Sequence, residues 1–452
     1  MPEILIRGGT VVTPDGAMAV DVTVAGGRIE GVGAGLAADG AEVVDASGLL
    51  VIPGVVDVHT HLRLGTDEHP HRFHRDTLAA ARGGTTTVLT FNNPGTGISD
   101  DGAASPLRGM REFRERTEGQ SIIDYGLSAV LSGAQADPVG ELPALIRAGV
   151  PTFKAFMVYD FRLPDEDLER AMATAARHGG MLQVHCEEPQ IIEPLIAEAM
   201  HDHRTDCRHH ALTRPAHAEA AATRKAIEMA RRAEAPLYIV HLSCSEALDA
   251  VAEAKSRGEP VYAETCPHYL TLTDDLYADP DEAEVIKRVI SPPLRGQADV
   301  DALWVGLRDG ILDVVGSDHV PDRVDTEKQV PAPPFPEISN GGPGIETMLG
   351  VTYSAGVAAR RISLVRMVEV LSTTPARLFG LPTKGAIEAG RDADLVLLDP
   401  GAQRTITQSD LNHTSDYTPY EGMPVTGAIR RVLVRGRAPG DAPGRYLERR
   451  LG

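Results

Sequence analysis

The chain has 452 residues, and its 64 Asp and Glu outnumber its 44 Lys and Arg, so the formal net charge is −20 at pH 7. A charge of this sign is repelled by phosphate backbones and anionic lipid surfaces, which argues against nucleic-acid and membrane partners. The densest apolar run, Gly48–Val56, is short and interrupted by Pro53, so no transmembrane helix is expected.

The amino terminus and the cysteines indicate the cellular compartment. The first residues lack the basic segment followed by an apolar stretch that marks a signal peptide. Four cysteines in so long a chain are too few for a disulfide framework, and they lack the paired spacing of a zinc site. We therefore expect a reduced, soluble, cytoplasmic protein.

Both ends of the chain are predicted to form short β-strands separated by glycine turns. The expected strands are Ile4–Arg7, Val11–Val12, Val20–Val24 and Arg28–Val32 in the first fifty residues, and Ala393–Leu398 and Arg431–Arg435 near the other end. We expect the first group to form an antiparallel unit. Together the two ends are expected to pair into one small β-sandwich domain of residues 1–52 and 384–452.

Between these ends, short apolar runs alternate with segments that have the spacing of amphipathic helices, such as Leu168–His178 and Ala218–Ala233. Eight strands are predicted, at Val55–His59, Thr86–Phe91, Ile122–Val130, Thr152–Phe156, Met181–His185, Leu237–His241, Val261–Thr265 and Leu312–Ser317. Strands that alternate with helices in this number are typical of an α/β protein with a (β/α)8 TIM-like barrel, here residues 53–383. The alternative is an open doubly wound sheet, but no Gly-x-Gly-x-x-Gly turn follows an early strand.

Residues that can bind a metal stand at the ends of several predicted strands. His59 and His61 close the first strand with one residue between them, so in extended chain both imidazoles point to the same side. His185 and His241 end the fifth and sixth strands, and Asp318 follows the eighth. In a barrel these carboxyl-terminal ends surround one pocket. Each histidine alone is more often a loop or core residue, but their joint placement predicts a shared metal site.

Lys154 lies inside the fourth predicted strand, within the apolar segment Phe153–Met157. A bare ammonium in a barrel interior carries a large desolvation cost, so it requires a partner or a chemical change. Carbamylation by carbon dioxide would convert the amine into a carboxylate that can bridge two divalent cations. Four imidazoles, one carbamate and one aspartate then fit a two-metal site. The simpler alternative is a lysine that reaches the barrel rim or pairs with a glutamate.

Other histidines have ligand-like spacing but lie in polar surroundings. Two groups are interpreted as loop residues rather than ligands: His201, His203, His209 and His210, and His69, His71 and His74. The role of His268, which follows the seventh strand, stays open between a structural one and one that supports the site.

Eight motifs occur in order along the chain: Gly54-Val-Val-Asp57-Val-His59-Thr-His61, Phe153-Lys154-Ala-Phe156-Met-Val-Tyr159, Val184-His185-Cys-Glu187, Tyr238-Ile-Val-His241, Ser291-Pro-Pro-Leu-Arg295, Gly316-Ser-Asp318-His319, Asn340-Gly-Gly-Pro-Gly and Lys384-Gly-Ala-Ile-Glu-Ala-Gly-Arg-Asp-Ala-Asp394. In this set, which spans nearly the whole chain, the sequence resembles the cyclic amidohydrolases of the dihydropyrimidinase and hydantoinase branch. The resemblance implies a binuclear zinc enzyme that opens a cyclic amide. Its implied metal ligands are His59, His61, carbamylated Lys154, His185, His241 and Asp318.

The resemblance also assigns residues to the substrate. Tyr159 is implied to hold the developing oxyanion, and backbone groups at Ser291 and Asn340 are implied to grip the amide edge of the ring. Asp318 is expected to pass a proton from the attacking hydroxide to the leaving nitrogen. Relatives of this kind assemble, so a homotetramer or homodimer is expected by analogy.

Two residues depart from this branch. Arg63 and Asn93 are more similar to dihydroorotases, in which such residues hold a substrate carboxylate. The alternative for Arg63 is a salt bridge to Asp67 or Glu68 at the barrel mouth. A dihydroorotase- or allantoinase-like hydrolase, acting on a carboxylate-bearing or ureido ring, is therefore the second functional hypothesis. A metal-free scaffolding protein is the third, and it is disfavoured because every ligand position is filled.

Overall fold

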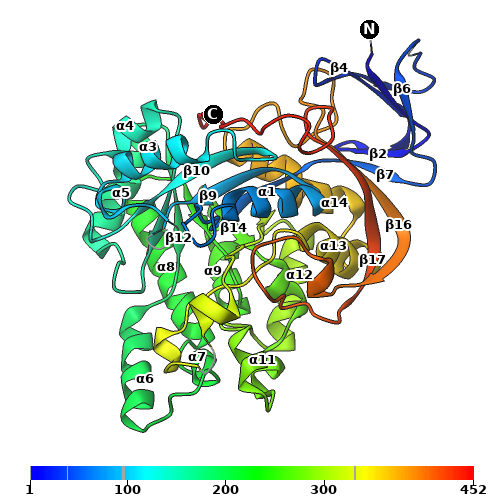
Figure 1. Ribbon diagram of the computed structural model, residues 1–452. Helices are drawn as coiled ribbons and strands as arrows, with labels where there is room; N and C mark the ends of the chain where they lie inside the picture. Colours follow the sequence, from blue (N-terminus) through cyan, green and yellow to red (C-terminus); the bar gives the residue numbers. More distant parts are fainter. Residues whose placement is uncertain (1, 38, 94–96, 330–331) are drawn as a thin grey trace.

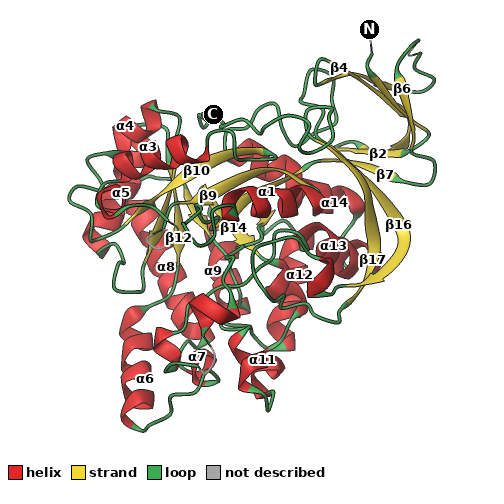
Figure 2. Cartoon of the chain, in the orientation of Figure 1, coloured by secondary structure: helices red, strands yellow, loops and turns green. Residues whose placement is uncertain are grey.

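The computed structural model describes residues 2–37, 39–93, 97–329 and 332–452. Its centre is an eight-stranded parallel sheet that curls around itself (Figures 1 and 2). The two end strands approach each other through a bridge between Thr60 and His319, where the N–H of His61 donates to the carbonyl oxygen of His319 at 2.8 Å. The sheet is thus a nearly closed barrel, which confirms the predicted fold class.

The barrel strands follow the prediction closely. They are β8 (Val55–Thr60), β9 (Thr85–Phe91), β10 (Asp124–Leu131), β11 (Thr152–Phe156), β12 (Met181–His185), β13 (Leu237–Ile239), β14 (Val261–Thr265) and β15 (Val314–Val315). Strand β11 is buried at every residue, as expected of a parallel strand covered on both faces. β13 and β15 end before their predicted last residues. Just beyond them His241 and Asp318 have positive φ values of 39° and 46°, a left-handed conformation that turns the chain away from the sheet.

Helices cover the outside of the barrel (Figure 2). The α-helices of the described residues, of which α6, α7 and α11 lie beyond one end of the barrel, are α1 (Arg72–Arg82), α2 (Asp100–Ala103), α3 (Pro106–Thr117), α4 (Leu142–Arg147), α5 (Asp165–Arg177), α6 (Pro189–His201), α7 (His209–Leu212), α8 (Ala216–Arg232), α9 (Ser245–Ser256), α10 (Pro267–Thr271), α11 (Glu282–Ile286), α12 (Gln297–Arg308), α13 (Met348–Thr352), α14 (Leu364–Val368) and α15 (Thr374–Leu378). Helix α5 shows why they form. Acidic residues in its first turn favour the positive end of the helix dipole, and Leu168, Ala171, Met172 and Ala175 lie on one buried face.

Two smaller sheets flank the barrel. Their strands are β1 (Ile4–Arg7), β2 (Thr10–Thr13), β3 (Gly16–Ala19), β4 (Asp21–Ala25), β5 (Arg28–Gly33), β6 (Glu42–Asp45), β7 (Leu50–Pro53), β16 (Leu395–Thr405) and β17 (Pro424–Leu433). The five-stranded sheet has the order β17-β16-β7-β2-β3, so strands from both ends of the chain share it. The predicted antiparallel unit is only partly right, because β1 pairs with β6, and β2 with β7, in parallel.

The last residues of the chain return to the barrel. The N–H of Leu447 donates to the carbonyl oxygen of Tyr125 at 2.7 Å, and buried Arg449 donates to the carbonyl oxygen of Leu127 at 2.5 Å. The segment after β17 therefore packs along β10 as well as continuing from the small sheets, and the predicted domain boundaries stay a prediction. In the part of the chain that the structure describes, no helix is both long and apolar enough to cross a membrane.

Candidate functional site

The structure brings the predicted metal-binding residues together at the carboxyl-terminal end of the barrel. Ligand atoms of His59, His241 and Asp318 lie within 4.8 Å of one another. Asp318 Oδ1 is 2.9 Å from His59 Nε2 and 3.2 Å from His61 Nε2. On the neighbouring strands, His185 Nδ1 and His241 Nε2 are 2.9 Å apart. One group of ligand atoms thus forms around Asp318, and a second forms between His185 and His241.

The second ring nitrogen of three of these histidines is held by an acceptor. The Nδ1–H of His59 donates to Glu264 Oε1 at 2.5 Å, and the Nδ1 of His61 lies 2.9 Å from Asn93 Oδ1. The Nε2–H of His185 donates to Glu187 Oε2 at 2.7 Å. An acceptor on one nitrogen fixes the tautomer and leaves the lone pair of the other nitrogen facing the centre. This arrangement is typical of metal-binding histidines.

The pKa shifts at the centre indicate three neutral histidines, one charged histidine and an ionised aspartate. Burial lowers the pKa of His61, His185 and His241, so these rings are uncharged near neutral pH. His59 differs, because Glu264 and Asp318 outweigh its burial and raise its pKa to about 9. The histidines hold the pKa of Asp318 well below its usual range in spite of burial. A cation at this centre would take the place of the proton on His59.

Lys154 lies in the middle of β11 with its side chain fully buried. Among the described residues its Nζ has no hydrogen-bond partner, and it lies 5.1 Å and 4.9 Å from the ring centroids of Phe91 and Phe156. Burial lowers its pKa to about 8. Its charge also lowers the pKa of all four histidines, so the amine is near both groups of ligand atoms. A buried amine that lacks a hydrogen-bond partner and lies near four imidazoles is consistent with carbamylation of Lys154.

The residues predicted to contact substrate lie beside this centre. Asn340 Nδ2 donates to the hydroxyl of Tyr159 at 3.4 Å, and Ser291 also bonds to that hydroxyl. Tyr159 has a φ of 77°, an unfavourable conformation for a non-glycine residue that is tolerated where function requires it. A small cavity lined by His268, Ile290, Asp318, Gly342 and Pro343 opens at the carboxylate.

The other histidines do not join the centre. His201 is the exposed last residue of α6, His203 is exposed just after that helix, and His209 and His210 lie on α7. His210 is buried, but its Nε2 lies 2.8 Å from the carbonyl oxygen of Ile290 and 3.3 Å from Ser291 Oγ, so it supports the substrate side.

Arg63 and Asn93 have partners within the protein. Arg63 forms ion pairs with Asp322 and, at 3.2 Å, with Glu327. These partners come from the loop after β15 rather than from the expected residues Asp67 and Glu68. Asn93 is the acceptor on His61 described above. Direct contact of either side chain with substrate stays a prediction.

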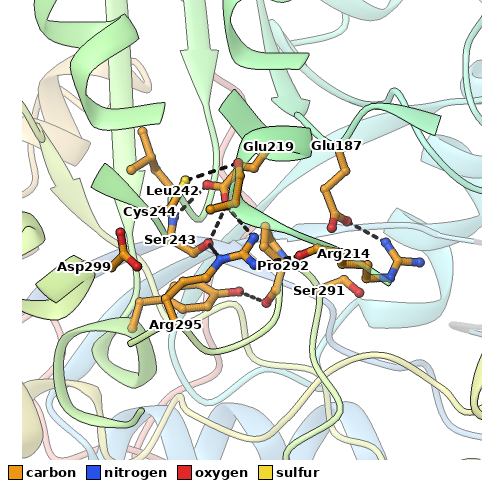
Figure 3. Close-up of polar contacts among 12 residues, drawn as sticks. Glu187, Arg214, Glu219, Leu242, Ser243, Cys244, Ser291, Pro292, Arg295 and Asp299 are labelled. Atoms are coloured by element: carbon orange, nitrogen blue, oxygen red, sulfur yellow. Dashed lines mark hydrogen bonds and ion pairs between the residues drawn. The ribbon is translucent and has the colours of Figure 1, made fainter. Parts of the chain in front are cut away.

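Sequence reasoning missed the acidic residues that hold the histidines. Glu264 is fully buried on β14, and Glu187 is buried directly after β12, where it also pairs with Arg214 at 2.8 Å. The available signal was an acidic residue within or beside an apolar strand, since a carboxylate is rarely buried without a partner. Arg214 and Glu187 are drawn in Figure 3.

Comparisons with known proteins show the family of the chain. The sequence pattern of the amidohydrolase family matches residues 50–438. The D-hydantoinase of Geobacillus stearothermophilus is 39% identical over 439 residues, which are 96% of this chain and 92% of that protein. The D-hydantoinase of Streptomyces coelicolor is 40% identical over 447 residues, 96% of this chain and 93% of that protein.

Solved structures show the same relationship. The dihydropyrimidinase of Brevibacillus agri superposes with a TM-score of 0.92 at 38% identity, over 99% of this chain and 98% of that one. With a barrel of this kind, a buried histidine centre and relatives matched along nearly their full length, the chain belongs to the amidohydrolase family, as a hydantoinase- and dihydropyrimidinase-like cyclic amide hydrolase.

Proposed function

We propose that this enzyme hydrolyses the ring amide bond of 5-substituted hydantoins or dihydropyrimidines and releases N-carbamoyl amino acids. The observation that carries the proposal is the buried centre formed by His59, His61, Asp318, His185 and His241, with the buried amine of Lys154 near enough to lower the pKa of all four histidines. The hydroxyl of Tyr159 lies at the substrate side of that centre. The names of the relatives support the same substrate class.

Two divalent cations, Zn²⁺ by preference, are proposed as the resident metals. The donors are nitrogen and oxygen atoms, the set that zinc binds in catalytic sites. Lys154 completes the set as a carbamate: its neutral amine adds to carbon dioxide, forms an N–C bond and releases one proton. The lowered pKa of Lys154, about 8, supports this step because a larger share of the amine is neutral near pH 7. When bound, the cations supply a water molecule acidic enough to act as a nucleophile at neutral pH.

The protein's own groups carry the remaining steps. Asp318, ionised at neutral pH, accepts a proton from the attacking water and delivers it to the leaving ring nitrogen. The hydroxyl of Tyr159 donates to the oxyanion that develops on the ring carbonyl. Backbone groups at Ser291 and Asn340 hold the amide edge, which keeps the carbonyl facing the centre.

A dihydroorotase- or allantoinase-like activity is less well supported. Arg63, the residue that would bind a substrate carboxylate, already forms ion pairs with Asp322 and Glu327. The relatives are named as hydantoinases and a dihydropyrimidinase. A location in the cytoplasm and a homotetramer or homodimer complete the proposal, on the resemblance to the cyclic amidohydrolases.

A substrate panel tests the function. We expect turnover of dihydrouracil and 5-substituted hydantoins, and little or none of dihydroorotate and allantoin, measured as release of the ring-opened product. Efficient turnover of dihydroorotate with inert hydantoins and dihydrouracil would contradict the proposal.

Metal analysis tests the centre separately. We expect about two divalent ions per chain, because four imidazoles, a carbamate and a carboxylate exceed the ligands of one tetrahedral ion. Elemental analysis of purified protein measures the ratio, and exhaustive chelation should abolish activity until metal is restored. Full activity of metal-free protein would disprove the mechanism.

A further inference from the structure

Two buried ion pairs lie beside the centre and form one connected unit (Figure 3). Arg214 Nη1 is 2.8 Å from Glu187 Oε2, and Arg295 Nη2 is 3.1 Å from Glu219 Oε2. Arg295 Nη1 also donates to the backbone carbonyl oxygen of Arg214 at 2.6 Å. All four side chains are at least nine-tenths buried, and their charges sum to zero. We call these four residues the arginine network.

Arg214 is the member of the network that contacts the active site on two sides. Through Glu187 Oε2 it is linked to the Nε2–H of His185, 2.7 Å from the same oxygen. Its guanidinium carbon also lies 5.3 Å from the ring centroid of Tyr159. Arg295 has neither contact. It bonds to Ser243 Oγ at 3.1 Å and to the backbone of Arg214, so it anchors the network from behind.

These contacts constrain two groups that the reaction needs in fixed positions. A carboxylate held by a guanidinium cannot rotate away from His185, so the ring keeps the tautomer whose Nδ1 faces His241. Tyr159 has an unfavourable backbone conformation, with a φ of 77°, and its ring is stabilised by a cation at its face. Arg214 therefore contacts the carboxylate that holds His185 and the ring of Tyr159, and it is not itself a candidate metal ligand.

We propose that Arg214 is a positioning residue for hydrolysis, which orients the metal ligand His185 through Glu187 and the oxyanion donor Tyr159 through direct contact with its ring. This inference rests on the roles proposed above for His185 and Tyr159. It predicts that loss of the guanidinium weakens metal binding and slows turnover together, although Arg214 is neither a ligand nor a substrate contact.

The test is Arg214→Gln, with Arg224→Gln as the matched control because Arg224 is exposed on α8. We expect Arg214→Gln to weaken Zn²⁺ affinity by about 10- to 100-fold, measured by competition with a chromogenic chelator, and to lower kcat by a similar factor with little change in KM. The control should keep the affinity and kcat of the wild type.

Two further variants separate positioning from folding. The single change leaves Glu187 as a buried charge without its arginine, whereas Glu187→Gln combined with Arg214→Gln removes both charges. We expect the double variant to recover thermal stability but not Zn²⁺ affinity. In a Tyr159→Phe background, Arg214→Gln should lower kcat clearly less than in the wild type, because the hydroxyl it positions is gone.

The results for these variants distinguish failure of the inference from failure of the proposed function. If Arg214→Gln folds and matches Arg224→Gln in Zn²⁺ affinity and kcat, the inference is overturned. Recovery of Zn²⁺ affinity in the double variant would also overturn it, since the defect would then be one of charge burial. If the wild type binds no metal and Tyr159→Phe is silent, the proposed function fails and the inference fails with it.

Discussion

Replacing Lys154 by alanine is expected to abolish hydrolysis and to lower the metal content of the protein. The carbamate proposed on Lys154 would supply an anionic ligand to the proposed cations, so its removal would weaken their binding. The stabilisation that a metal centre supplies amounts to several kcal/mol, and each 1.4 kcal/mol is tenfold in rate. We therefore expect kcat/KM to fall by about 10³-fold or more, measured with a hydantoin substrate alongside elemental analysis.

The control for this variant is Lys255→Ala, because Lys255 lies on α9, pairs with Asp313 at 2.7 Å and is not among the candidate ligands. It should keep metal and activity. A short carboxylic acid added to Lys154→Ala should restore part of both by filling the vacated position. In metal-stripped wild type, labelled carbon dioxide should be taken up faster at pH 9 than at pH 6, since Lys154 is protonated below a pKa of about 8. An unmodified amine in metal-loaded crystals would contradict the prediction.

The barrel could be predicted because its strands are local apolar runs. Strands β11, β12 and β14 occupy the predicted residues, since each is a short buried run bounded by turns or polar segments. The strands of the two small sheets were harder to predict from the sequence. β6 has exposed residues and no alternating pattern, and its parallel pairing with β1 joins residues 38 positions apart, from Ile4 to Glu42. Such pairing depends on contacts that no local pattern records.

The placement of the candidate histidines and Asp318 at one end of the barrel could be predicted for the same reason, because each stands at or near the end of an apolar run. Their role as metal ligands stays a prediction. Their supporting residues could not be predicted. Glu264 reaches His59 across 205 positions of sequence, and Arg63 finds Asp322 across 259. Both pairings depend on the nearly closed barrel, which brings β14 and the loop after β15 beside β8. A local pattern could therefore suggest that Arg63 would pair, but it indicated the nearer residues Asp67 and Glu68.

The proposed substrate contacts are tested most directly by comparing variants of Tyr159 and Arg63. The first is proposed to contact the substrate and the second to pair within the protein. Tyr159→Phe should lower kcat by about 10²- to 10³-fold, the cost of losing one oxyanion donor, with unchanged metal content. Its control is Tyr446→Phe, whose buried hydroxyl has no hydrogen-bond partner among the described residues and lies against β10. Steady-state kinetics on a hydantoin measures both. A silent Tyr159→Phe would remove the hydroxyl from the mechanism.

Arg63→Ala should instead act on stability. Removing the guanidinium leaves Asp322, whose side chain is fully buried, without its cation, and breaking a buried pair in this way costs about 3–5 kcal/mol. We expect a lower free energy of unfolding and an unchanged KM for hydantoins and dihydrouracil. If Arg63 instead held a substrate carboxylate, losing a charge-assisted pair of about 1.5–3 kcal/mol would raise KM for dihydroorotate by about 10- to 150-fold. That rise, with hydantoins inert, would reassign Arg63 to the substrate and overturn the proposed specificity.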